Sequence, residues 1–91
     1  MKPKNILVVY TEPKSVTEKQ TLEVVKNALK KHKIKYSMSN REKLNKKLFQ
    51  SKDIVIAVGG DGTFLRTAHF ILDKTPIFGV NSDPQYKEGF F

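Results

Sequence analysis

The chain has 91 residues, and its 17 Lys and Arg outnumber its nine Asp and Glu enough to give a formal net charge of +8, which favours anionic partners such as phosphates. A chain of this length can bury one modest core, so we expect a single domain over residues 1–91. The absence of cysteine excludes disulfides and thiolate metal sites, and the lack of a long apolar segment or a signal peptide predicts a cytoplasmic protein with no membrane partner.

The first third of the chain predicts a strand followed by a helix. Residues 5–10 (NILVVY) form a short apolar run rich in β-branched side chains, which is typical of a strand covered on both faces. Ser15 and Glu18 have the spacing of a capping box, and the apolar side chains that follow lie on one helical face as far as about Lys33. This is the pattern of a βα unit.

A second unit of the same kind is expected next. Residues 34–38 (IKYSM) alternate apolar and polar side chains, like a half-buried strand. Ser39 and Glu42 repeat the capping-box spacing before a lysine-rich segment, which predicts a helix over residues 42–50 with its lysines facing solvent. Its buried stripe would consist of Leu44, Leu48 and Phe49.

The second half of the chain continues the alternation. Residues 53–58 (DIVIAV) give the strongest buried-strand signal, residues 63–72 place apolar side chains at helical spacing, and residues 76–80 (PIFGV) indicate one more strand. Parallel strands need crossover helices, so the pattern predicts an α/β fold with an open, mostly parallel sheet of about four strands flanked by helices. Tyr10 and Phe78 are expected in the core.

The motif GGDGT leaves the carboxyl end of the most buried predicted strand, where ligands of open α/β sheets bind. Gly59, Gly60 and Gly62 lack side chains that would keep a phosphate from the backbone N–H groups. The following helix offers unpaired N–H donors and the positive end of its dipole, and Thr63 can add a hydroxyl donor. The spacing differs from that of a P-loop and of a dinucleotide-binding fold.

Asp61 is the only carboxylate in this motif, and a carboxylate repels a phosphate unless it has a task of its own. It can hold a metal ion, accept a hydrogen bond from a substrate hydroxyl, or take that hydroxyl's proton during phosphoryl transfer. Asp-Gly is also a common turn pair and Asp a common helix N-cap, so the local sequence leaves a structural role open as well.

The segment GGDGTFLR, followed by a helix and then PIFGVN, resembles the N-terminal domain of the NAD kinases. The resemblance runs from NILVVY to the end of the chain and is specific from about Asp53 onward. GGDGT alone is shared with diacylglycerol and sphingosine-type lipid kinases and, in variant form, with phosphofructokinases. The residues FLR after the motif and GVN at the end of the next strand favour the NAD kinases.

The resemblance implies transfer of a phosphoryl group from ATP, or another phosphoryl donor, to the 2′-hydroxyl of the adenosine ribose of NAD. It implies a divalent metal ion such as Mg²⁺ and a full-length protein that forms a homo-oligomer. Asp61 would be the general base toward the hydroxyl, Gly62 would lie against the dinucleotide, and Arg66 would approach NAD. Gly59, Gly60 and Thr63 would contact the phosphates.

The end of the chain departs from the common family pattern. The segment NSDPQYKEGFF is longer than the usual glycine-containing loop and is similar to a divergent branch that includes the mitochondrial-type NAD kinases. Asn81 and Asp83, at the carboxyl end of a predicted strand, are candidates to line the cleft. The family's second, mostly β domain is absent, so we expect the 91-residue piece to be inactive alone.

Two other functions stay open from the sequence. A lipid or sugar kinase could use the same GGDGT cradle, and a non-catalytic basic α/β module could use it as a turn. The lysine-rich segments LKKHKIKY and REKLNKKL carry neither interleaved aromatic residues nor an arginine cluster. We therefore expect solvated surfaces there, and nucleotide substrates but no nucleic acid as partners.

Overall fold

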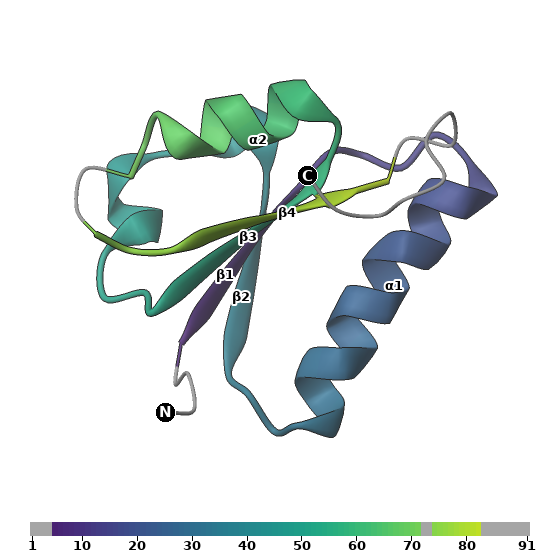
Figure 1. Cartoon of the computed structure of the whole chain (residues 1–91), viewed down its shortest axis with the longest axis horizontal. Helices are drawn as coiled ribbons and strands as arrows, with labels where there is room; N and C mark the ends of the chain where they lie inside the picture. The colour runs from purple at the N-terminus through teal and green to yellow at the C-terminus, as the bar shows by residue number, and fades with distance from the viewer. Residues whose placement is uncertain (1–4, 72–73, 83–91) are drawn as a thin grey trace.

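The computed structural model describes residues 5–71 and 74–82 of the chain. Strands and helices alternate along these residues, as Figure 1 shows. The elements are β1 (Ile6–Tyr10), α1 (Val16–Lys31), β2 (Tyr36–Asn40), the 3₁₀ turns η1 (Arg41–Lys43) and η2 (Lys46–Phe49), β3 (Ile54–Gly59), α2 (Asp61–Ala68) and β4 (Ile77–Asn81).

The four strands form one parallel sheet in the order β2-β1-β3-β4. Ile6 of β1 lies opposite Tyr36 of β2 on one side and Ile54 of β3 on the other. The two central strands are covered on both faces, which explains their nearly continuous apolar sequences. The predicted α/β fold with an open parallel sheet of four strands is confirmed.

The two α-helices cover opposite faces of the sheet (Figure 1). Alternate residues of β1 point to opposite faces, so each face has its own hydrophobic cluster. The cluster on the α1 side contains Ile6, Val8, Leu29 and Val58, and partly buried Tyr10 packs against it. The cluster on the other face is centred on Leu7, Val9 and Val55, and the expected stripe of Leu44, Leu48 and Phe49 packs there.

The first helix begins as the sequence predicts. The side chain of Ser15 accepts a hydrogen bond from the backbone N–H of Glu18 at 3.1 Å. The helix ends at Lys31, two residues before the predicted end at Lys33. The second helix starts at Asp61 and ends at Ala68, earlier at both ends than the predicted range of 63–72.

The predicted helix over residues 42–50 is wrong. Asn40 and Asn45 each accept a hydrogen bond with their side chain, from the N–H of Glu42 at 2.9 Å and from that of Leu48 at 3.2 Å. Asparagine side chains that bond the nearby backbone in this way compete with a continuous helix, and here they start two separate 3₁₀ turns. The expected cap at Ser39 is not formed, because β2 extends through this residue to Asn40.

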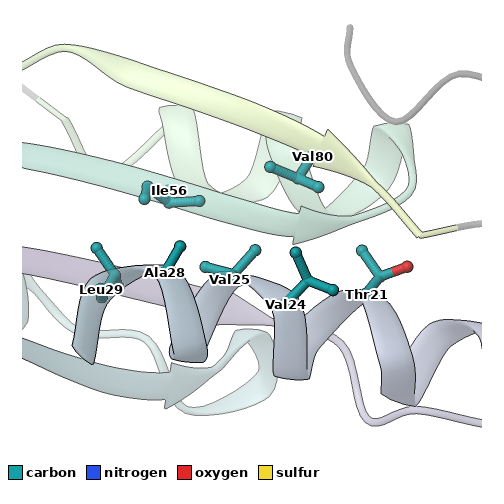
Figure 2. A pocket seen from close by; sticks show the side chains of 7 residues that line it. All are labelled: Thr21, Val24, Val25, Ala28, Leu29, Ile56 and Val80. Carbon is teal, nitrogen blue, oxygen red and sulfur yellow. The ribbon is translucent and has the colours of Figure 1, made fainter. Parts of the chain in front are cut away.

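The face of the sheet under α1 is only partly covered. Phe78, expected in the core, is 57% exposed on β4, opposite Ile56 in the strand register. Between α1 and the sheet lies a groove of about 370 Å³, shown in Figure 2. Its lining is almost wholly apolar and consists of Thr21, Val24, Val25, Ala28, Leu29, Ile56 and Val80. The prediction for Phe78 failed because the cluster that packs with Leu29 of α1 takes Val80 from β4 and does not include Phe78.

Neither helix within the described ranges combines the length and the hydropathy that a bilayer-spanning segment requires.

Candidate functional site

The carboxyl ends of the strands bring the GGDGT motif together with distant parts of the chain. Gly59 is the last residue of β3 and lies opposite Asn81, the last residue of β4. The N–H of Ser82 donates to the carbonyl of Gly59 at 3.2 Å, and the N–H of Thr11, just after β1, donates to the carbonyl of Val58 at 3.2 Å. The motif therefore occupies the edge of the sheet where ligands of open α/β folds bind.

Gly59 sits where no side chain fits. A Cβ atom added there would lie 2.6 Å from the hydroxyl oxygen of Thr63 and 2.8 Å from that of Thr11. Both distances are well inside van der Waals contact. The first glycine of the motif is thus required by two hydroxyl groups of the protein itself, and its predicted contact with a phosphate stays a prediction.

Thr63 connects three elements from a fully buried position, with 0% of its surface exposed. Its hydroxyl group forms a hydrogen bond with that of Thr11 after β1, and it also accepts one from Nη1 of Arg41 in η1 at 3.3 Å. Its carbonyl accepts from the hydroxyl of Thr67 at 2.7 Å. Its predicted role as a hydrogen-bond donor to a phosphate stays a prediction, whereas these contacts show that it holds the loop in place.

Gly60, and not Asp61, is the N-cap of α2, and no side chain caps this helix end. The carbonyl of Gly60 accepts from the N–H groups of Thr63 and Phe64 at 3.1 and 3.3 Å. A Cβ atom at Gly60 would meet no atom within 4 Å. The second glycine thus faces open space directly before the helix, where a ligand could approach the backbone.

Asp61 is the first residue of α2 and is exposed. Within residues 5–71 and 74–82, no hydrogen bond or ion pair of its carboxylate is found. The possibility that Asp61 serves as the N-cap is therefore contradicted. A carboxylate held at the start of a helix, beside open space at Gly60, is placed to meet a ligand group.

The structure adds a charged cluster that the sequence reading did not anticipate. Nε of Arg41 lies 3.2 Å from Oε1 of Glu42, and Nη1 of Arg66 lies 3.0 Å from the same oxygen. The third glycine, Gly62, is close to this cluster, because a Cβ atom there would lie 3.4 Å from Nη1 of Arg41. We name Arg41, Glu42 and Arg66 the arginine–glutamate cluster.

Arg41 was missed because the sequence placed it beside a solvent-facing helix. The usable signal was the position of the second strand, since a residue that directly follows a parallel strand lies at the same sheet edge as the motif. The prediction ended that strand at Met38, two residues before its true end at Asn40. With the strand ended at Met38, Arg41 was not recognised as the residue that directly follows it.

The described residues contain no group of three or more His, Cys, Asp or Glu side chains that could hold a metal ion. Asp61 alone would offer a carboxylate ligand from the motif. Magnesium ions in nucleotide sites commonly take one or two protein carboxylates and complete their coordination with phosphate oxygens and water. The donor set fits a metal ion brought in with a nucleotide better than a resident one.

Comparisons with known proteins identify the family to which the chain is similar. Residues 3–83 match the family model described as the ATP-NAD kinase N-terminal domain. A "Probable NADH kinase" of Oryza sativa subsp. japonica is 36% identical over 75 residues, or 82% of this chain and 23% of the relative. The "NADH kinase" of Arabidopsis thaliana is 37% identical over 75 residues, which are also 82% of this chain and 23% of the relative.

The human protein "NAD kinase 2, mitochondrial" is 35% identical over 71 residues, which are 77% of this chain and 16% of the relative. The chain thus spans less than a quarter of the length of each of these three relatives.

Proposed function

This chain belongs to the ATP-NAD kinase family, whose N-terminal domain it matches over residues 3–83, and from this membership we propose that the full-length protein is a NAD kinase. The resemblance based on GGDGTFLR and GVN is confirmed at the level of the family, and a mitochondrial-type protein is among the relatives. In the proposed reaction, a phosphoryl group passes from ATP to the 2′-hydroxyl of the adenosine ribose of NAD. This family membership also favours NAD kinase over the lipid and sugar kinases that share GGDGT.

The observation that carries the proposal is the position of Asp61. Its carboxylate is exposed on the first turn of α2, and among the described residues it neither caps the helix nor forms a hydrogen bond or ion pair. We propose that it accepts the proton of the attacking 2′-hydroxyl, which leaves the oxygen free to bond the incoming phosphorus. Phosphoryl transfer requires mainly such positioning together with charge stabilisation.

The remaining motif residues have supporting roles in this proposal. The first N–H groups of α2, which follow Gly60 and the open space beside it, would donate to phosphate oxygens. Arg66 and Asn81 would contact the dinucleotide from either side of the loop, while Gly62 leaves space next to it. A bound Mg²⁺ would neutralise charge on the phosphates, and Asp61 is the carboxylate of the motif that could hold it.

The acceptor dinucleotide is the first detail to determine. Two plant relatives carry the name NADH kinase, and the human one carries the name NAD kinase. Assays of the full-length protein should therefore compare NAD and NADH as acceptors at equal concentration, with ATP as donor and Mg²⁺ present.

We expect Asp61→Asn in the full-length protein to lower kcat for dinucleotide phosphorylation by about 100-fold or more, because a positioned general base contributes roughly 10²- to 10⁴-fold. The matched control is Glu23→Gln, which removes an exposed carboxylate of α1 away from the motif and should leave kcat unchanged. Thermal melts of both variants separate loss of the base from loss of folding. A kcat for Asp61→Asn within a few fold of wild type would rule out the general-base role.

The same proposal includes a cytoplasmic location, a homo-oligomeric full-length protein and no nucleic-acid partner. Subcellular fractionation and light scattering of the full-length protein test the first two. The absence of a shift with duplex and single-stranded DNA in a mobility assay at physiological salt would support the third.

A further inference from the structure

We propose that Arg41 is a phosphate-binding residue of this site. Glu42 accepts from Arg41 and Arg66 in the structure, and a bound nucleotide phosphate replaces Glu42 as the acceptor of both arginines. The ligand group is a pyrophosphate, which both ATP and the dinucleotide contain. This inference rests on the proposed NAD kinase function and names a ligand contact that the GGDGT motif does not include.

The backbone after β2 fixes where Arg41 begins. Asn40 ends the strand, and its side chain accepts from the N–H of Glu42 at 2.9 Å, which holds the first turn of η1 in place. From there the side chain of Arg41 extends to α2, where Nη1 donates to the hydroxyl of Thr63 at 3.3 Å. The guanidinium therefore lies against the first turn of the helix that carries Asp61.

Gly62 lies next to this guanidinium. A Cβ atom at position 62 would lie 3.4 Å from Nη1 of Arg41, at ordinary van der Waals contact. The third glycine of the motif thus borders a positive charge next to the helix N-terminus. That charge adds to the positive end of the helix dipole, which attracts anions.

The arginine–glutamate cluster holds more positive than negative charge. One oxygen of Glu42 receives both guanidinium groups, at 3.2 Å from Nε of Arg41 and at 3.0 Å from Nη1 of Arg66. One carboxylate cannot neutralise two guanidinium groups. Among the described residues, Nη2 of Arg41 donates no hydrogen bond, so its two N–H groups can donate to another partner.

Glu42, the present partner of both arginines, is one that a phosphate can replace. The side chain of Glu42 is 61% exposed, against 33% for Arg41 and 50% for Arg66. Exposed ion pairs are weak and screened by salt. A pyrophosphate carries more charge than a carboxylate and offers paired oxygens that match the fork of the guanidinium group. It is therefore the better acceptor for both arginines.

Arg41→Gln in the full-length protein tests the proposal. We expect the KM for one of the two nucleotides to rise by about tenfold or more, since a charge-assisted phosphate contact is lost, while kcat stays within about threefold. Measuring KM separately for ATP and for the dinucleotide identifies which pyrophosphate Arg41 binds. Arg41→Lys should recover part of the affinity because it keeps the charge but not the fork.

The matched control is Lys43→Gln, which removes one exposed positive charge from the same 3₁₀ turn. Its KM values should equal those of wild type. If both KM values of Arg41→Gln stay within twofold of those of Lys43→Gln, the proposal is wrong and Arg41 only braces the loop through Thr63.

Glu42→Gln tests the second half of the proposal. Removing the competing carboxylate should lower the same KM by about two- to fivefold, because the arginines no longer leave an ion pair to bind phosphate. A higher KM would overturn this step and show that Glu42 holds the arginines in place for the ligand.

A binding measurement separates this inference from the proposed function. Calorimetric titration of wild type and Arg41→Gln with inorganic pyrophosphate, ATP and NAD requires no turnover. If wild type binds pyrophosphate and the variant binds it at least several-fold more weakly, Arg41 binds phosphate even if NAD is not the acceptor. If wild type phosphorylates NAD and the two proteins bind all three probes equally, only the Arg41 proposal fails.

Discussion

At the scale of single residues, adjacent glycines of the motif serve different purposes. A Cβ atom at Gly59 would collide with the hydroxyl groups of Thr63 and Thr11, whereas a Cβ atom at Gly60 would meet nothing. The first glycine thus allows the strand end to pack against buried Thr63 and partly buried Thr11, and the second leaves open space before the helix. A motif that the sequence presents as one phosphate cradle combines a packing requirement with an open surface.

This contrast predicts different effects of alanine at the two positions in the full-length protein. Gly59→Ala should destabilise the domain by about 1–3 kcal/mol, because the added Cβ atom would lie 2.9 Å from the Cβ atom of buried Thr63. Gly60→Ala should cost less than about 1 kcal/mol, the difference between glycine and alanine at an N-cap. Urea unfolding followed by circular dichroism measures both. Equal losses of stability would contradict the packing role of Gly59.

At the scale of elements, the helices and strands that depend on apolar periodicity could be predicted from the sequence. The 3₁₀ turns, which depend on hydrogen bonds between side chains and the nearby backbone, could not. The strands, α1 and its Ser15 cap follow from apolar patterns and capping-box spacing, and all were predicted to within a few residues. Residues 42–50 carry the same kind of pattern, but the caps at Asn40 and Asn45 divide the segment into two 3₁₀ turns. The presence of an asparagine alone could not distinguish one continuous helix from two 3₁₀ turns, because its side chain does not always bond the nearby backbone.

The same reasoning explains which site residues were predictable. Asp61 and the glycines are contiguous in sequence and follow a clear strand, so their place at the sheet edge could be inferred. Arg41 and Thr11 reach the motif only through the parallel order of β2, β1 and β3, which the sequence does not specify. Their contacts with Thr63 required the fold to be known.

Two serines provide a test at the scale of elements. Ser15→Ala removes the side-chain cap of α1 and should destabilise the protein by about 1 kcal/mol. Ser37→Ala in β2 should be neutral or slightly stabilising, because its buried hydroxyl has no hydrogen-bond partner in the described structure and is costly to leave unpaired. Both variants remove one hydroxyl, so each is the other's control. Similar thermal midpoints for the two would argue against the cap.

At the scale of the whole molecule, the four described strands form one sheet whose faces are unequally covered. The order β2-β1-β3-β4 and the two helices confirm the predicted α/β class. The groove beside α1 and the exposed Phe78 leave an apolar area over β3 and β4. This asymmetry could not be predicted, because the strand sequences show that a side chain is apolar but not whether a helix covers it.

We expect the 91-residue chain alone to show no phosphorylation of NAD or NADH under conditions in which the full-length protein is active. Asp61 and the glycine loop follow the carboxyl end of β3 in this chain, but the chain spans less than a quarter of the length of the relatives it matches. A coupled assay for NADP or NADPH formation, with the full-length protein as positive control, measures this. Turnover by the short chain within tenfold of the full-length rate would show that it contains the whole active site.

The parallel order of the sheet also determines how the chain must fold during synthesis. β1 is made first, yet its partners are distant in sequence: Ile6 pairs with Tyr36 and with Ile54. Parallel neighbours cannot form a hairpin, so β1 emerges with both edges unpaired and with its apolar residues unburied. Contacts between distant residues slow folding and prolong exposure of such a strand. Until β3 leaves the ribosome, the segment ILVV is thus the part of the nascent chain most in need of protection from aggregation.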